Sequence, residues 1–120
     1  MKHIISLSFF LLLIMSCSSD DNNLVCSVEN PIENLNWLKS EIDLLKNNEE
    51  EYNYVTQTKH NDQTVFVFAN CNPLINSVFL VKNCEGNNIG IIGMGEQDIP
   101  STILDNGIII WKAENSECDF

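Results

Sequence analysis

The sequence predicts an α+β fold in which one amphipathic helix packs on an antiparallel sheet of about five strands, with two disulfides. Three observations lead to this prediction. Residues 31–46 repeat their apolar side chains at helical spacing. Several later segments show the two-residue alternation or short apolar runs that are typical of strands. The cysteines that follow Cys17 form an even set, as a disulfide framework requires.

The predicted helix has a start signal, an apolar stripe and a stop signal. Asn30 is the expected N-cap, Pro31 suits the first helical position, and Glu33 lies in the first turn. We expect one continuous helix of about sixteen residues, ended by Asn47 and Asn48. The stripe that should face the sheet consists of Ile32, Leu35, Leu38, Ile42 and Leu45.

The strands are expected to follow one another as a meander. Residues 52–59 and 63–69 should form a hairpin around His60-Asn61-Asp62. A long loop at 94–107, with one helical turn at 100–104, should precede the last strand. The other three predicted strands are residues 77–83, 88–92 and 108–112.

Both faces of the predicted sheet are apolar, although only one helix is available to cover them. In the strand 63–69, Val65 and Val67 point to one face while Phe66 and Phe68 point to the other. We expect the second face to be covered by the 94–107 segment, through Ile99, Ile103 and Leu104. A protein partner on this second sheet face is the alternative, because large bare apolar patches are uncommon on monomers.

The four later cysteines are Cys26, Cys71, Cys84 and Cys118, and they allow three pairings. The expected strand directions place Cys26, Cys84 and Cys118 near one end of the sheet and Cys71 near the other. A flexible tail that lets Cys118 reach Cys71 favours Cys26–Cys84 with Cys71–Cys118. No Cys-x-x-Cys motif occurs, and His60 is the only histidine after residue 16. We therefore predict no metal site and no cofactor.

The N-terminus carries a processing signal. After Lys2, the apolar run 4–15 is too short to remain as a membrane span, and it ends in Ile14-Met15-Ser16-Cys17. This ending resembles the lipobox of bacterial lipoproteins. The resemblance implies cleavage before Cys17 and lipidation of Cys17 with diacylglycerol and a further acyl chain such as palmitate. The predicted parts are a signal peptide at 1–16, a lipidated tether at 17–29 and an α+β domain at 30–120.

The residues after Cys17 indicate where the anchor places the protein. Asp20 and Asp21 lie in a polar, acidic stretch that resembles the surface-export signal of Bacteroidetes-type lipoproteins. The resemblance implies a protein that is lipid-anchored in the bacterial outer membrane and faces the cell surface. An ordinary solvated linker, which would leave the domain in the periplasm, is the alternative.

The net charge restricts the possible partners. The chain has a formal charge of −11, and removal of residues 1–16, which contain Lys2, leaves −12. The six basic residues are all lysines, so no guanidinium can clamp a phosphate. An acidic chain also repels nucleic acid. We therefore exclude nucleic acid as a partner.

No residue pattern predicts catalysis, so the catalytic set is predicted to be empty. His60 falls in an expected turn, and the Gly90–Gly95 stretch lacks the following Lys-Ser/Thr of a phosphate loop. The acidic clusters at 49–51 and 96–98 lack a calcium-loop pattern. Trp37 and Trp111 could stack in a ligand site, although large aromatic residues are usually core.

Four short stretches resemble a family of small Bacteroidetes lipoproteins whose C-terminal domain has no assigned function. They are residues 36–39 (NWLK), 63–68 (QTVFVF), 83–87 (NCEGN) and 118–120 (CDF). The resemblance implies no enzyme activity. We predict a non-catalytic binding or accessory module. The alternatives are an inhibitor-like periplasmic protein or an enzyme that uses an acidic pair such as Glu96 and Asp98.

Overall fold

A computed structural model describes residues 24–48, 51–74, 78–93 and 99–120. Two helices, α1 (Pro31–Asn34) and α2 (Asn36–Asn47), precede the first strand. The strands are β1 (Asn53–His60), β2 (Gln63–Asn70), β3 (Phe79–Lys82), β4 (Asn88–Ile92) and β5 (Ile108–Lys112). A 3-10 helix, η2 (Ser101–Asn106), lies between β4 and β5.

The five strands form one antiparallel sheet in the order β4-β3-β2-β1-β5, which confirms the predicted α+β class. The predicted meander holds for β1 to β4 but was wrong for β5, because residues 99–107 cross one face of the sheet from the β4 edge to β1 and place β5 beside β1. Strands β1 and β2 form the expected hairpin, and Asn61 and Asp62 both take positive φ in its turn. Positive φ at both central residues suits the right-handed twist of a two-residue hairpin. The bounds of β4 and β5 match the prediction, whereas β3 begins at Phe79 and Ser77 lies outside the described residues.

The prediction of one continuous helix was wrong. Leu35 has extended backbone angles (φ −93°, ψ 106°) and separates α1 from α2. Asparagine has low helix propensity and competes for backbone groups, and Asn34 and Asn36 flank this break. Asn30 precedes α1, as predicted, but it lies in the left-handed region and its side chain makes no capping hydrogen bond.

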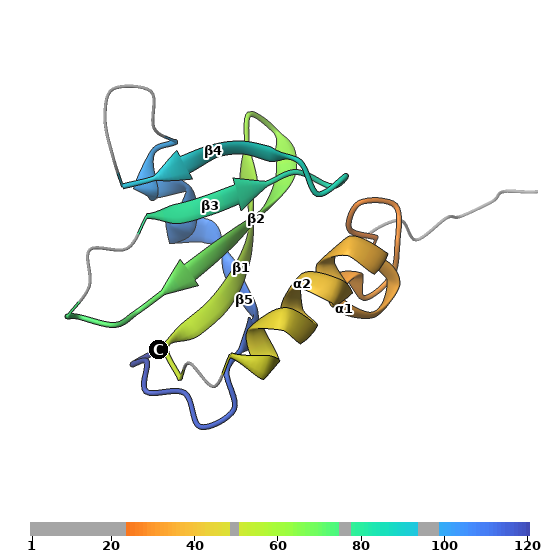
Figure 1. Cartoon of the computed structure of the whole chain (residues 1–120). Coiled ribbons are helices and arrows are strands. Elements are labelled where there is room, and N and C mark those ends of the chain that lie inside the picture. The colour runs from red at the N-terminus through yellow and green to blue at the C-terminus, as the bar shows by residue number, and fades with distance from the viewer. Residues whose placement is uncertain (1–23, 49–50, 75–77, 94–98) are drawn as a thin grey trace, which may run out of the picture.

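The sheet buries both of its faces, as the alternation in β2 predicted. On the face that we call the helix face, α2 places Leu38 and Ile42 against Val55 and Phe66. On the opposite face, residues 99–107 bring Ile99, Ile103 and Leu104 against β1 to β4, as expected. We call this the short-segment face, and Figure 1 shows the two coverings on opposite sides of the sheet. Its buried members are Val65, Val67, Ala69, Val81, Ile92 and Ile99.

Side-chain bonds attach both coverings to the sheet. Trp37 Nε1 donates to the carbonyl of Cys84 at 2.7 Å, and Lys82 Nζ pairs with Glu41 at 3.2 Å. On the other face, the hydroxyl of Thr58 donates to the carbonyl of Ile103. These contacts fix α2 and η2 at their positions on the sheet.

The two disulfides are Cys26–Cys84 and Cys71–Cys118, which is the predicted pairing. The first joins the segment before α1 to the turn after β3, and places Val25 and Cys26 against the helix-face cluster. The second joins the end of β2 to the C-terminal tail. Among the described residues, no helix has the length and apolarity to cross a membrane.

Candidate binding surface along strand β5

The last strand, β5, is an edge strand that pairs with β1 and has no other partner strand within the described ranges. The pairing register shifts between Val55 and Thr56, so Ile110 is an extra residue in β5. This bulge lets Ile110 and Trp111 both pack against the helix-face cluster. Ile108 and Ile109 remain exposed.

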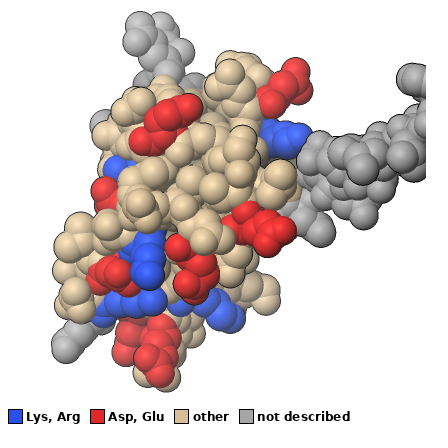
Figure 2. Space-filling view, turned by 90° about the vertical axis from the view of Figure 1, so that its right-hand side faces the viewer, with Lys and Arg blue, Asp and Glu red and all other residues tan. Residues whose placement is uncertain are grey.

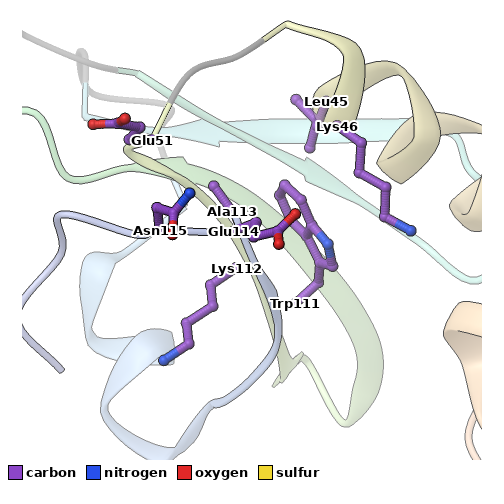
Figure 3. Close-up of a pocket in the computed structure, with 8 residues that line it drawn as sticks. All are labelled: Leu45, Lys46, Glu51, Trp111, Lys112, Ala113, Glu114 and Asn115. Atoms are coloured by element: carbon purple, nitrogen blue, oxygen red, sulfur yellow. The ribbon is translucent and has the colours of Figure 1, made fainter.

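The first hollow beside β5, which we call the Trp111 groove, has a volume of about 560 Å³. Its walls are the end of α2, Glu51 ahead of β1, and the end of β5 with the start of the tail. Figure 3 shows the side chains that line it. They are Leu45, Lys46, Glu51, Trp111, Lys112, Ala113, Glu114 and Asn115.

Trp111 is the central feature of this groove because its indole N–H has no hydrogen-bond partner among the described residues. The indole N–H of Trp37, in contrast, is satisfied by the carbonyl of Cys84. A half-buried tryptophan usually finds a partner for its N–H. Trp111 therefore offers both an aromatic surface and a donor to a molecule in the groove.

The tail that forms one wall of the groove is held at several points. Ala113 N donates to Asn53 O at 3.0 Å, and Glu117 N donates to Glu51 O at 3.2 Å. The Cys71–Cys118 disulfide then joins the tail to the end of β2. The groove is thus built on ordered backbone, which favours a preformed binding site.

A second hollow of about 480 Å³, which we call the Phe120 hollow, also lies on β5. Its lining shares Trp111 and Lys112 with the groove and adds Ile109, Ile110 and Phe120. The Phe120 ring packs edge-on against Tyr54 at 5.0 Å between centroids, and Lys112 Nζ lies 5.7 Å from the Phe120 centroid. Burial raises the pKa of the Tyr54 hydroxyl above its usual value of 10.0.

Charged groups around the Trp111 groove carry both signs. Lys46 lies 3.8 Å from Asp43 in an exposed pair that contributes little stability. Glu51 and Glu114 contribute carboxylates to the rim. Figure 2 shows acidic and basic side chains intermixed on the side of the molecule that carries α2. The groove can therefore pair with polar and charged groups at its rim while Trp111 and Leu45 contact apolar groups.

The structure separates the other residues that the sequence singled out. Trp37 contacts the rings of Phe66 and Phe68 in the core, at 5.6 and 6.4 Å. His60 ends β1, and its ring Nε2 lies 3.3 Å from Asn61 Nδ2. Cys17, Glu49, Glu50, Glu96 and Asp98 lie outside the described residues.

Two further findings concern ligands. Gly90 lies in the irregular part of the β3–β4 pairing, where the register shifts, and no long helix follows it in the described segments. Within these segments, no group of three or more histidine, cysteine or acidic side chains is placed to hold a metal ion.

Sequence reasoning named Trp111 but missed the groove. The groove depends on the end of α2 meeting the tail that follows β5, and these segments are about 65 residues apart in the chain. A signal was present in the run Ile108-Ile109-Ile110-Trp111, because a strand that is apolar on both faces needs a covering element on each face.

The chain matches no family model, no curated protein and no solved structure. The family resemblance stays a prediction.

Proposed function

We propose that this chain is a lipid-anchored, non-catalytic binding protein of the bacterial outer membrane, facing the cell surface, and that it docks a protein partner at the Trp111 groove. The observation that carries the binding role is the groove itself. The volume of the groove, about 560 Å³, lies within the usual range for ligand sites. The half-buried side chain of Trp111 lines it, and the indole N–H of Trp111 has no hydrogen-bond acceptor among the described residues.

The anchoring part of the proposal rests on Cys17 and its sequence context. Two disulfides suit an oxidising compartment outside the cytoplasm, which supports export. Two or more acyl chains hold a protein stably on a membrane, whereas one chain holds it only marginally. Acidic residues at positions 20 and 21 support the outward-facing orientation through their resemblance to an export signal.

Anchoring is tested with cells fed a labelled palmitate analogue. The wild-type protein should carry the label and fractionate with the outer membrane, and Cys17→Ser should lose the label. A membrane-impermeant biotin reagent that reacts with lysine should then modify the protein on intact cells. An unlabelled, soluble wild-type protein would contradict the anchor, and biotinylation only after lysis would place the domain in the periplasm.

Binding at the groove is tested with a photo-cross-linking residue at Asn115, which lines the groove. The matched control carries the same residue at Asp43, on the outside of α2. A discrete cross-linked species should form at position 115 alone, and adding Trp111→Ala should remove it. Equal cross-linking at both positions, or none at position 115, would overturn the groove as the docking site.

A further inference from the structure

The outer edge of β5 presents backbone groups without a partner strand in the described part of the chain. Ala113 N donates to Asn53 O, and successive residues of a strand direct their backbone groups to opposite edges. The backbone N–H and C=O of Lys112 therefore face away from β1. A row of such groups is a template for another strand.

The opposite edge of the sheet is protected. Ile99 N donates to Ile91 O at 2.9 Å, so the outer side of β4 already has a backbone partner at this point. The pairing of β4 with β3 is also irregular, because Val81 pairs with Gly90 and Lys82 with Asn88, which leaves Ile89 as an extra residue. Bulges and covering segments are the usual means of keeping an edge from pairing.

The two hollows are placed to receive side chains from a strand added to β5. The Trp111 groove opens on the side of α2. The Phe120 hollow shares Trp111 and Lys112 with the groove and extends toward the short-segment face through Ile109 and Lys112, whose partners Thr56 and Tyr54 pair with Val67 and Ala69 of that face. Figure 3 shows the side chains of Trp111 and Lys112 pointing in opposite directions from β5. Because successive side chains of an added strand also alternate, each hollow would receive every second one.

The charge of the chain indicates the occupant. A chain with a formal charge of −11 attracts a basic segment and repels a second copy of itself. At the groove rim, Glu51 and Glu114 can accept bonds from lysine or arginine. The positive charge of Lys112 already lies near the Phe120 ring. Apolar residues would enter the hollows, and basic residues would reach the rim.

We propose that β5 accepts an extended, basic segment of the partner protein by strand addition, with alternate side chains in the Trp111 groove and the Phe120 hollow. This inference rests on the proposed function and names the chemistry and conformation of its partner. In this mode of recognition, main-chain hydrogen bonds supply affinity and the flanking pockets supply specificity.

The test uses the detergent-solubilised full-length protein and capped peptides of about eight residues, a typical strand length. The probe alternates valine and lysine, and binding is followed by tryptophan fluorescence and calorimetry. We expect it to bind, and a valine–glutamate peptide or an N-methylated valine–lysine peptide to bind at least about tenfold more weakly. N-methylation removes peptide donors without altering the protein, so loss of folding cannot produce this result.

Ile109→Lys is the test variant on the protein, and Ile89→Lys is its matched control. Both residues are isoleucines on edge strands with almost equal exposure, 41% and 42%. Ile109→Lys should weaken binding of the valine–lysine peptide about tenfold, because it adds a like charge beside the edge. Ile89→Lys should leave the affinity unchanged. Equal effects of the two substitutions would overturn the inference.

Three outcomes separate this inference from the proposed function. If the peptides fail to bind while cross-linking at position 115 persists, strand addition is wrong and the groove stands. If the peptides fail to bind and no cross-linked species forms at position 115, both strand addition and the groove as a docking site are wrong. If sedimentation shows a dimer that Ile109→Lys dissociates, β5 pairs with a second copy and a foreign basic segment is not the occupant.

Discussion

Both faces of the sheet are buried, but they are covered by elements of different size. The helix face lies under α2, and the Cys26–Cys84 disulfide and the Trp37 hydrogen bond hold the segments around it. The short-segment face lies under residues 99–107, which contribute three apolar side chains and one hydrogen bond from Thr58. A sheet of this size can therefore close its second face without a second helix.

The difference between the two coverings is also seen in where the surface is hollowed. Helix α2 ends at Asn47, and its last turn supplies Leu45 and Lys46 to the wall of the Trp111 groove. The 99–107 segment, which contains η2, is instead bonded directly to the sheet backbone, because Ile99 N donates to Ile91 O at the β4 edge. The candidate binding surface thus lies at the end of the α-helical covering.

The largest expected effect comes from truncating one buried isoleucine in each covering. Ile42→Ala should destabilise the protein by about 4 kcal/mol and Ile99→Ala by about 2 kcal/mol. Both side chains are buried, at 1% and 6% exposed, but the rigid helix cannot move to fill the cavity as the short segment can. Urea unfolding midpoints at an unchanged m value measure the difference. Equal losses would show that the short segment is as rigid as the helix.

A glycine on each face gives an intermediate comparison. Gly86 has φ +83°, and an added Cβ would lie 2.7 Å from Cδ2 of Trp37, so Gly86→Ala combines backbone strain with a clash. Gly107 has a negative φ, so its added Cβ would bring no backbone strain, but it would lie 2.5 Å from the Thr56 methyl and 3.3 Å from Leu104 O and Thr58 Cβ.

We expect losses of stability of about 3 kcal/mol for Gly86→Ala and about 1 kcal/mol for Gly107→Ala. The near-ultraviolet circular dichroism of tryptophan should change for the first variant and not for the second. A larger loss for Gly107→Ala would mean that the short-segment face is the more tightly packed of the two.

The smallest expected effect concerns Tyr54, on the short-segment face. Burial raises the pKa of its hydroxyl, so the folded state keeps the proton at a pH where the unfolded state has lost it. Stability from this group is therefore constant below about pH 10 and falls as the pH rises through the raised folded pKa. Tyr54→Phe should reduce this alkaline decline in urea titrations at pH 9 to 11, after correction for the stability change at pH 7. An identical decline in the wild type and in Tyr54→Phe would refute the attribution of the decline to the Tyr54 hydroxyl.

Local patterns in the sequence were sufficient to predict the five strands, but the position of β5 beside β1 depends on a long-range crossover that these patterns do not contain. Strict alternation in Val65–Ala69 identifies two apolar faces, and the bounds of β4 and β5 follow from short apolar runs between turn residues. The disulfide pairing was predicted correctly although the expected meander placed Cys71 and Cys118 at opposite ends of the sheet. Because β2 and β5 are both antiparallel to β1, they end at the same end, and this brings Cys118 to Cys71.

The break at Leu35 and the Trp111 groove were not predictable by the same reasoning. Leu35 fits the apolar stripe whether or not the helix continues through it, so periodicity gives no sign of its extended backbone. The groove depends on the end position of α2 relative to the tail. That relation is set by tertiary packing and by a β-bulge at Ile110, neither of which a single-sequence pattern contains.

The two disulfides have a consequence for resistance to proteolysis. The loop closed by Cys26–Cys84 overlaps the loop closed by Cys71–Cys118, and the overlap runs from residue 71 to 84. Cleavage of any single peptide bond between Cys26 and Cys118 therefore leaves two fragments that are still covalently joined. Surface loops are the usual sites of such nicks. A protease must cut the chain twice, or a reductant must open a disulfide, before any part of this region is released.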